Sequence, residues 1–70
     1  MEMVSSGIIA QRLIELRGDL SRETVAAACG ISKSALTMYE LGARIPRDEI
    51  KVRLASYYNK TVGEIFFEKQ

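Results

Sequence analysis

The chain has 70 residues, of which 47% are hydrophobic and 27% are charged. This length predicts one domain over residues 1–70, and the apolar content is too high for a disordered chain. A single cysteine and no histidine exclude an internal disulfide framework and argue against a zinc site. We therefore expect no metal and no cofactor.

No apolar stretch reaches the roughly 18 residues that cross a bilayer, and residues 1–6 lack a signal-peptide pattern. These features predict a cytoplasmic protein without a membrane partner. The net charge is only +1 and the pI is 7.9, whereas nucleic-acid-binding domains usually have a pI above about 9. The distribution of charge over the surface therefore matters more than its sum.

Apolar residues recur at helical spacing through most of the chain, and no two-residue alternation lasts for five residues. Gly18, Gly30 and Gly42 fall between the periodic segments, where helices are expected to end. Ser21, Ser32 and the capping-box pair Thr61–Glu64 mark helix starts. The predicted helices cover residues 7–17, 21–29, 33–41 and 47–58, with a short last helix through Ile65, Phe66 and Phe67.

The segment 21–41 contains a cap, a helix, Gly30-Ile31, a second cap at Ser32 and another helix. Gly30 permits a left-handed turn, and Ala26 is small where the two helices would cross. This is the arrangement of a helix-turn-helix, whose second helix can enter the major groove of DNA.

Residues 20–46 resemble the phage-repressor and Cro family of helix-turn-helix proteins, also called the XRE type. The matching positions are Leu20, Ser21, Glu23, Ala26, Gly30, Ile31, Ser32, Leu36, Glu40, Gly42, Arg44 and Pro46. The first helix also matches, at Ile9, Leu13, Leu16 and Arg17, as does the tail at Leu54, Ala55, Val62, Glu64, Ile65 and Phe66. The resemblance implies an all-α, lambda-repressor-like bundle of five helices, with helices 2 and 3 forming the helix-turn-helix.

The resemblance also implies roles for individual residues in a sequence-specific transcriptional regulator, most simply a repressor. Helix 33–41 would lie in the major groove, and Arg17 would pair with Glu40 to tie the first helix to the recognition helix. The implied DNA-binding residues are Arg22, Ser32, Lys33, Ser34, Thr37, Met38, Arg44 and Arg47.

The residue chemistry agrees with these roles. Lys33 can donate to guanine O6 and N7, while Ser34 and Thr37 can donate or accept. Residues 20–47 contain four basic side chains, at positions 22, 33, 44 and 47, against two acidic ones, at positions 23 and 40. If Glu40 pairs with Arg17, its negative charge is neutralised. Residues 20–47 then carry a larger positive charge than the net charge of the whole chain suggests.

The sequence departs from the family pattern in three places. Arg22 stands where the family usually has a glutamine that touches a phosphate, and the loop at Gly18-Asp19 is two residues shorter than usual. The recognition positions lack the glutamine and arginine side chains that make bidentate base contacts. Specificity is therefore expected to depend partly on DNA shape or on water-mediated contacts.

Three consecutive apolar residues, Ile65, Phe66 and Phe67, cannot all be buried equally by one helix. We interpret them as a surface for self-association. The resulting homodimer would bind a roughly palindromic operator with recognition helices about 34 Å apart.

A protein-interaction module is the first alternative function class for this sequence, and an enzyme is the second. A protein-interaction module with incidental DNA affinity would fit the low net charge, although the basic loop 44–47 argues against it. An enzyme is not expected, because the chain has no histidine, no nucleophile beside a base and no phosphate-binding glycine loop. No small-molecule ligand is evident.

Overall fold

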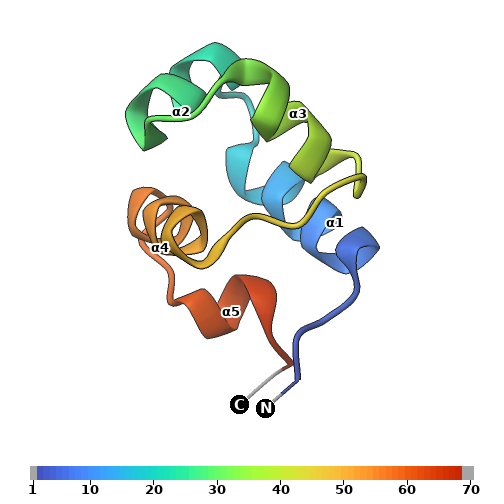
Figure 1. The fold of residues 1–70 in the computed structure, drawn as a ribbon. Coiled ribbons are helices and arrows are strands. Elements are labelled where there is room, and N and C mark those ends of the chain that lie inside the picture. The colour runs from blue at the N-terminus through green and yellow to red at the C-terminus, as the bar shows by residue number, and fades with distance from the viewer. Residues whose placement is uncertain (1, 69–70) are drawn as a thin grey trace.

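The computed structural model describes residues 2–68, over which the chain forms a compact bundle of five helices (Figure 1). These helices are α1 (Ser6–Arg17), α2 (Arg22–Cys29), α3 (Lys33–Glu40), α4 (Asp48–Tyr57) and α5 (Val62–Phe66). The all-α prediction is confirmed, and the predicted helix boundaries agree within one or two residues. None of these helices is long and apolar enough to cross a membrane.

Serine and threonine side chains begin four of the helices. Ser5 caps α1 by accepting a hydrogen bond from the Ile8 N–H at 3.3 Å, so α1 starts one residue earlier than predicted. Ser21 and Ser32 cap α2 and α3 in the same way. Thr61 opens α5 with the predicted capping box. Each cap satisfies backbone N–H groups that have no partner within the helix.

The core lies where the apolar stripes of the helices meet. Leu13, Leu36, Leu54 and Phe66, from α1, α3, α4 and α5, are fully buried. Helix α1 packs against α3 and α5, while α2 packs against α3 and α4. Since both α2 and α3 rest on other helices, the helix-turn-helix has a rigid support.

Gly42 fixes the way in which the chain leaves α3. Its φ of 74° lies in the left-handed region, and an added Cβ would lie 3.4 Å from the Ser6 carbonyl oxygen. The Ala43 N–H donates back to the Met38 carbonyl oxygen at 3.0 Å. This tight turn therefore packs closely against the start of α1, just before the basic loop 43–47.

The two ends of the described chain lie side by side, which the sequence did not predict (Figure 1). The Val4 N–H donates to the Phe66 carbonyl oxygen at 3.0 Å, and Met3 and Phe67 form an antiparallel bridge. Arg12 donates to the carbonyl oxygens of Ile65 and Phe67 at 3.0 and 3.1 Å. Helix α5 is therefore attached both to α1 and to the N-terminal segment.

The predicted self-association surface needs correction at two of its three residues. Ile65 and Phe66 are 1% and 0% exposed and belong to the core. Helix α5 ends at Phe66, so Phe67 has left the helix; it is half-buried and lies 5.9 Å from the Lys51 ammonium. The prediction was wrong for Ile65 and Phe66 because α1, α4 and the N-terminal segment cover this helix, which the local sequence does not show.

Candidate nucleic-acid interface

The turn between α2 and α3 holds the two helices of the helix-turn-helix in a fixed relation. Gly30 ends α2 with a φ of 70°, and the Ile31 N–H donates to the Ala26 carbonyl oxygen at 3.0 Å. Ile31 itself is partly buried against the core. The turn is thus held by both a backbone hydrogen bond and an apolar anchor.

Helix α3 is divided into a buried face and an accessible face. Leu36, Tyr39 and Glu40 are buried, whereas Ser32, Lys33 and Ser34 at its start are exposed. Thr37 and Met38 are half-buried. The five predicted base-reading and capping residues of α3 therefore all retain some exposure, which is greatest at the N-terminal end of the helix.

Lys33 has a partner that sequence reasoning missed. Its ammonium lies 2.9 Å from the Glu23 carboxylate on α2, and both side chains are largely exposed. The hydrogen bond from Lys33 lowers the pKa of Glu23 below its usual value. In this exposed pair the Lys33 ammonium lies beside α2, and the Glu23 carboxylate places a negative charge on the predicted DNA-binding surface.

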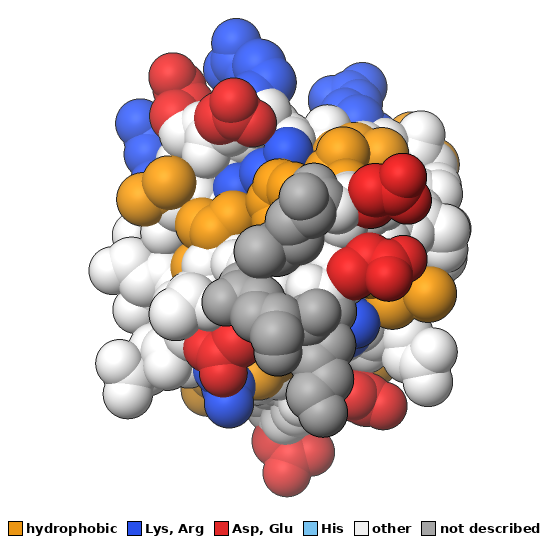
Figure 2. Space-filling model, turned by 90° about the horizontal axis from the view of Figure 1, so that it is seen from below, with side chains coloured by type: hydrophobic (Ala, Val, Ile, Leu, Met, Phe, Trp, Pro, Cys, Tyr) orange, Lys and Arg blue, Asp and Glu red, His pale blue; other side chains and the backbone are white. Residues whose placement is uncertain are grey.

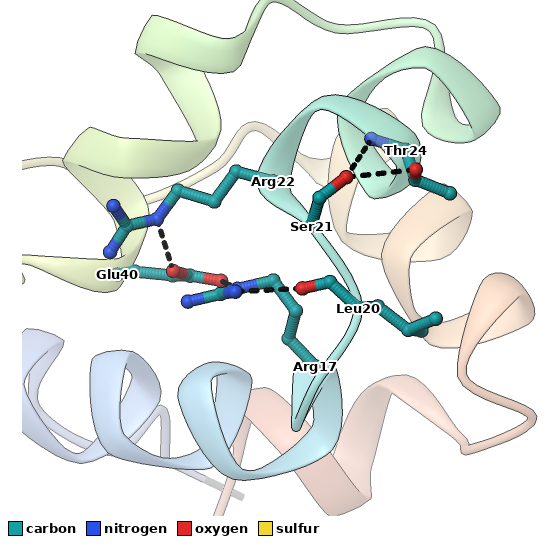
Figure 3. Close-up of polar contacts among 6 residues, drawn as sticks. All are labelled: Arg17, Leu20, Ser21, Arg22, Thr24 and Glu40. Atoms are coloured by element: carbon teal, nitrogen blue, oxygen red, sulfur yellow. Dashed lines mark hydrogen bonds and ion pairs between the residues drawn. The ribbon is translucent and has the colours of Figure 1, made fainter.

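Glu40 is shared by two arginines from different helices (Figure 3). Arg17 Nε donates to Glu40 Oε2 and Arg22 Nε donates to Glu40 Oε1, both at 2.8 Å. The Glu40 side chain has no solvent exposure, while those of Arg17 and Arg22 are 17% and 33% exposed. The hydrogen bond to Glu40 raises the pKa of Arg17, which also donates to the Leu20 carbonyl oxygen at 2.8 Å.

This cluster changes the expected surroundings of Arg22. The expected Arg17–Glu40 pair is present, but Arg22 also binds Glu40. Two guanidinium groups and one carboxylate leave one net positive charge in the cluster. Because Nε is used by Glu40, the terminal nitrogens of Arg22 are the atoms available to an incoming phosphate.

Arg44 and Arg47 are exposed on the loop between α3 and α4. Both line a hollow of about 400 Å³ that Ser32 also lines. Arg53 of α4 lines the same hollow and was not selected from the sequence. Its placement depends on the packing of α4 against the turn, for which local sequence gives no signal.

The end of the bundle opposite the helix-turn-helix has a different distribution of charge. Figure 2 shows the face with α5 and the chain ends, where acidic, basic and hydrophobic side chains are mixed. A surface for a polyanion needs an excess of positive charge. The helix-turn-helix end meets that condition better than this face does, because Arg44 and Arg47 have no recorded ion pair among residues 2–68.

Comparison with known proteins decides the family. A family model described as helix-turn-helix matches residues 9–65. The chain belongs to this helix-turn-helix family. The XRE-type resemblance predicted from residues 20–46 is thereby confirmed.

Solved structures give the same result. The restriction-modification controller protein C.AhdI from Aeromonas hydrophila has 32% identity and a TM-score of 0.80, with 87% of this chain and 96% of that chain covered. LexA, an SOS-response transcriptional repressor from Eubacterium rectale, has 20% identity and a TM-score of 0.84 over 94% of this chain and 72% of that chain.

A transcriptional regulator from Listeria innocua has 21% identity and a TM-score of 0.80, covering 100% of this chain and 64% of that chain. The similarities to LexA and to the Listeria innocua regulator, both under 25% identity, show the fold alone. No curated protein matches the sequence significantly. The family match and the C.AhdI likeness support a DNA-binding transcriptional regulator.

Proposed function

We propose that the protein is a sequence-specific repressor that inserts the N-terminal end of α3 into the major groove of an operator. The observation that carries this proposal is the arrangement of exposed Ser32, Lys33 and Ser34 at the start of a helix whose other face is buried. Lys33 would donate to a guanine, and Thr37 and Met38 would contact bases one turn further along. Repression would follow from occupying the DNA.

The proposed backbone contacts flank this helix. Arg22 would approach one phosphate with its terminal nitrogens while Glu40 holds its Nε. Arg44 and Arg47 would contact the sugar-phosphate backbone from the loop after α3. Ser32 already caps α3 through its hydroxyl, which accepts from the Ala35 N–H at 3.0 Å, and would contact phosphate from that position.

The salt dependence of binding tests whether DNA is the ligand. Each neutralised phosphate contributes about −0.9 to the slope of log K against log salt concentration. Three phosphate-binding arginines therefore predict a slope of about −2.7 or steeper per protomer, measured by fluorescence anisotropy on duplex DNA. A nearly flat dependence, or no binding, would contradict the proposal and favour a protein-interaction module.

We also propose that two protomers bind a roughly palindromic site. Of the three residues first assigned to the interface, only Phe67 has a side chain that is not fully buried. Sedimentation of the free protein at micromolar concentration, and of its complex with a two-half-site duplex, measures the assembly. We expect two protomers on that duplex, and a single protomer in both conditions would refute the dimer.

A further inference from the structure

A strongly basic hollow lies beside the start of α3, between the turn of the helix-turn-helix, the α3–α4 loop and α4. Its volume is about 400 Å³, and its charged lining consists of Arg44, Arg47, Arg53 and Glu49. The lining charge is therefore three positive against one negative. Guanidinium groups repel one another, so their convergence on one hollow favours an anionic ligand.

No ion pair is recorded between these arginines and a carboxylate within the described part of the chain. Among residues 2–68, the structure records ion pairs for Arg17, Arg22, Lys33 and Lys51, and none for the three arginines of the hollow. The positive end of the α3 dipole adds to their potential, because Ser32, the cap of α3, lines the same hollow.

Gly30 leaves room for the end of the Arg53 side chain beside the turn. An added Cβ at Gly30 would lie 3.4 Å from Arg53 Nη1, so the guanidinium rests against the bare backbone of the turn. The Cys29 thiol donates to the Arg53 carbonyl oxygen at 3.9 Å, which sets this part of α4 beneath the end of α2. Arg53 is thus positioned by the same turn that positions α3.

We propose that Arg53 binds a phosphodiester group of the DNA backbone at this hollow, next to the phosphates that Arg44 and Arg47 contact. Helix α4 then contributes directly to the DNA interface and does more than support α2. The contact is independent of sequence, because a phosphate carries no base information. This inference rests on the proposed DNA-binding function, to which it adds a residue outside the helix-turn-helix and the loop.

Salt-dependent binding of Arg53→Gln to duplex DNA tests the site. Loss of one phosphate contact makes the slope less negative by about 0.9 per protomer, which weakens binding roughly eightfold at about 0.1 M salt. The loss should be equal on preferred and unrelated duplexes. Arg53→Lys, which keeps the charge, should retain the wild-type slope.

Lys60→Gln is the matched control, because it removes one exposed positive charge at the start of the α5 segment, outside this hollow. We expect its slope to stay near that of wild type. An unchanged slope for Arg53→Gln, or an equal change for Lys60→Gln, would overturn the proposal. Thermal unfolding of both variants by circular dichroism confirms that they are folded.

Two further results distinguish a failure of the proposed DNA-binding function from a failure of the proposed phosphate site. A wild-type protein that does not bind duplex DNA would refute the proposed function itself, and this site with it. Inorganic phosphate is the second probe, and its binding is monitored by the NMR signal of the Arg53 Nε–H. Binding of inorganic phosphate at Arg53 together with a wild-type DNA slope in Arg53→Gln would assign the hollow to a free anion and overturn the proposal.

Discussion

Glu40 has a carboxylate without solvent contact, and its two oxygens each accept a hydrogen bond from a different arginine. A buried charge is costly unless it is paired, and removing one partner leaves the others uncompensated. Here the carboxylate joins α1, α2 and α3 at one point (Figure 3). It therefore contributes both to stability and to the orientation of Arg22.

Glu40→Gln should be strongly destabilising, because it leaves two guanidinium groups close together without an anion. We expect the free energy of unfolding to fall by about 3 kcal/mol, measured by urea denaturation. Glu23→Gln is the control, since it removes a carboxylate from an exposed ion pair and should hardly shift the urea midpoint. Similar losses in both variants would disprove the structural role of Glu40.

Tyr58 presents the opposite case, a buried polar group without a partner. Within residues 2–68, its hydroxyl has no hydrogen-bond partner, and burial, with a smaller effect of Glu40, raises its pKa to about 12. An unpartnered buried hydroxyl costs about 1–3 kcal/mol. Part of that cost should be recovered when the hydroxyl is removed.

Tyr58→Phe should therefore keep or increase the free energy of unfolding at pH 7, by up to about 1 kcal/mol. The raised pKa adds a pH test: between pH 10 and 12 the unfolded chain loses the Tyr58 proton while the folded chain keeps it. Wild-type stability should thus fall relative to the phenylalanine variant over that window. A constant difference between the two proteins from pH 9 to 12 would contradict this account.

At the scale of helices, local sequence predicted much of the fold. Caps and helix-ending glycines act over three or four residues, so Ser21, Ser32, Thr61 and Gly30 could be recognised directly. Contacts between distant segments carry no such local signal. The three-way contact of Glu40 and the pairing of Met3 with Phe67 therefore had to come from the structure.

The difference between local signals and long-range contacts also explains which site residues could be predicted from the sequence. Helical periodicity places Ser34 and Met38 opposite the buried Leu36 and Tyr39, whereas Lys33 is accessible because it stands in the first turn of α3. Arg53 belongs to the hollow only because α4 packs beneath the turn at Gly30. Ile65 and Phe66 were misplaced because periodicity cannot show where a five-residue helix ends or what covers it.

Helix α5 is short, so its start should be sensitive to the capping box. Thr61 accepts from the Glu64 N–H at 3.1 Å, and the Glu64 carboxylate accepts from the Thr61 N–H at 2.8 Å. Thr61→Ala should lower the free energy of unfolding by about 1 kcal/mol in urea denaturation. No loss would mean that Arg12 and the N-terminal segment hold α5 without its cap.

The capping box should also depend on pH. The hydrogen bond from the Thr61 backbone lowers the pKa of Glu64 below 4.5. A lowered pKa means that this stabilisation is present above pH 4.5 and is lost as the pH falls through the lower folded-state value. Wild type should therefore lose more stability than Glu64→Gln on going from pH 5 to pH 2, by circular dichroism in urea; equal losses would contradict the role of the carboxylate.

At the scale of the whole molecule, a net charge of +1 hides an uneven distribution. Carboxylates of the protein pair with Arg17, Arg22, Lys33 and Lys51, whereas Arg44, Arg47 and Arg53 surround one hollow beside α3. The low overall charge that argued against DNA is thus compatible with a basic surface at one end. Affinity would come from this end and specificity from the exposed start of α3.

The most direct test of that account is selection of bound sequences from a random DNA pool by wild type and by Lys33→Ala in parallel. Wild type should enrich a two-fold symmetric site with half-sites about one helical turn, or 34 Å, apart. Lys33→Ala should keep this spacing but lose the preference for guanine at one position in each half-site. Enrichment of no site by wild type, or of the same bases by both proteins, would contradict the claim that the start of α3 reads DNA.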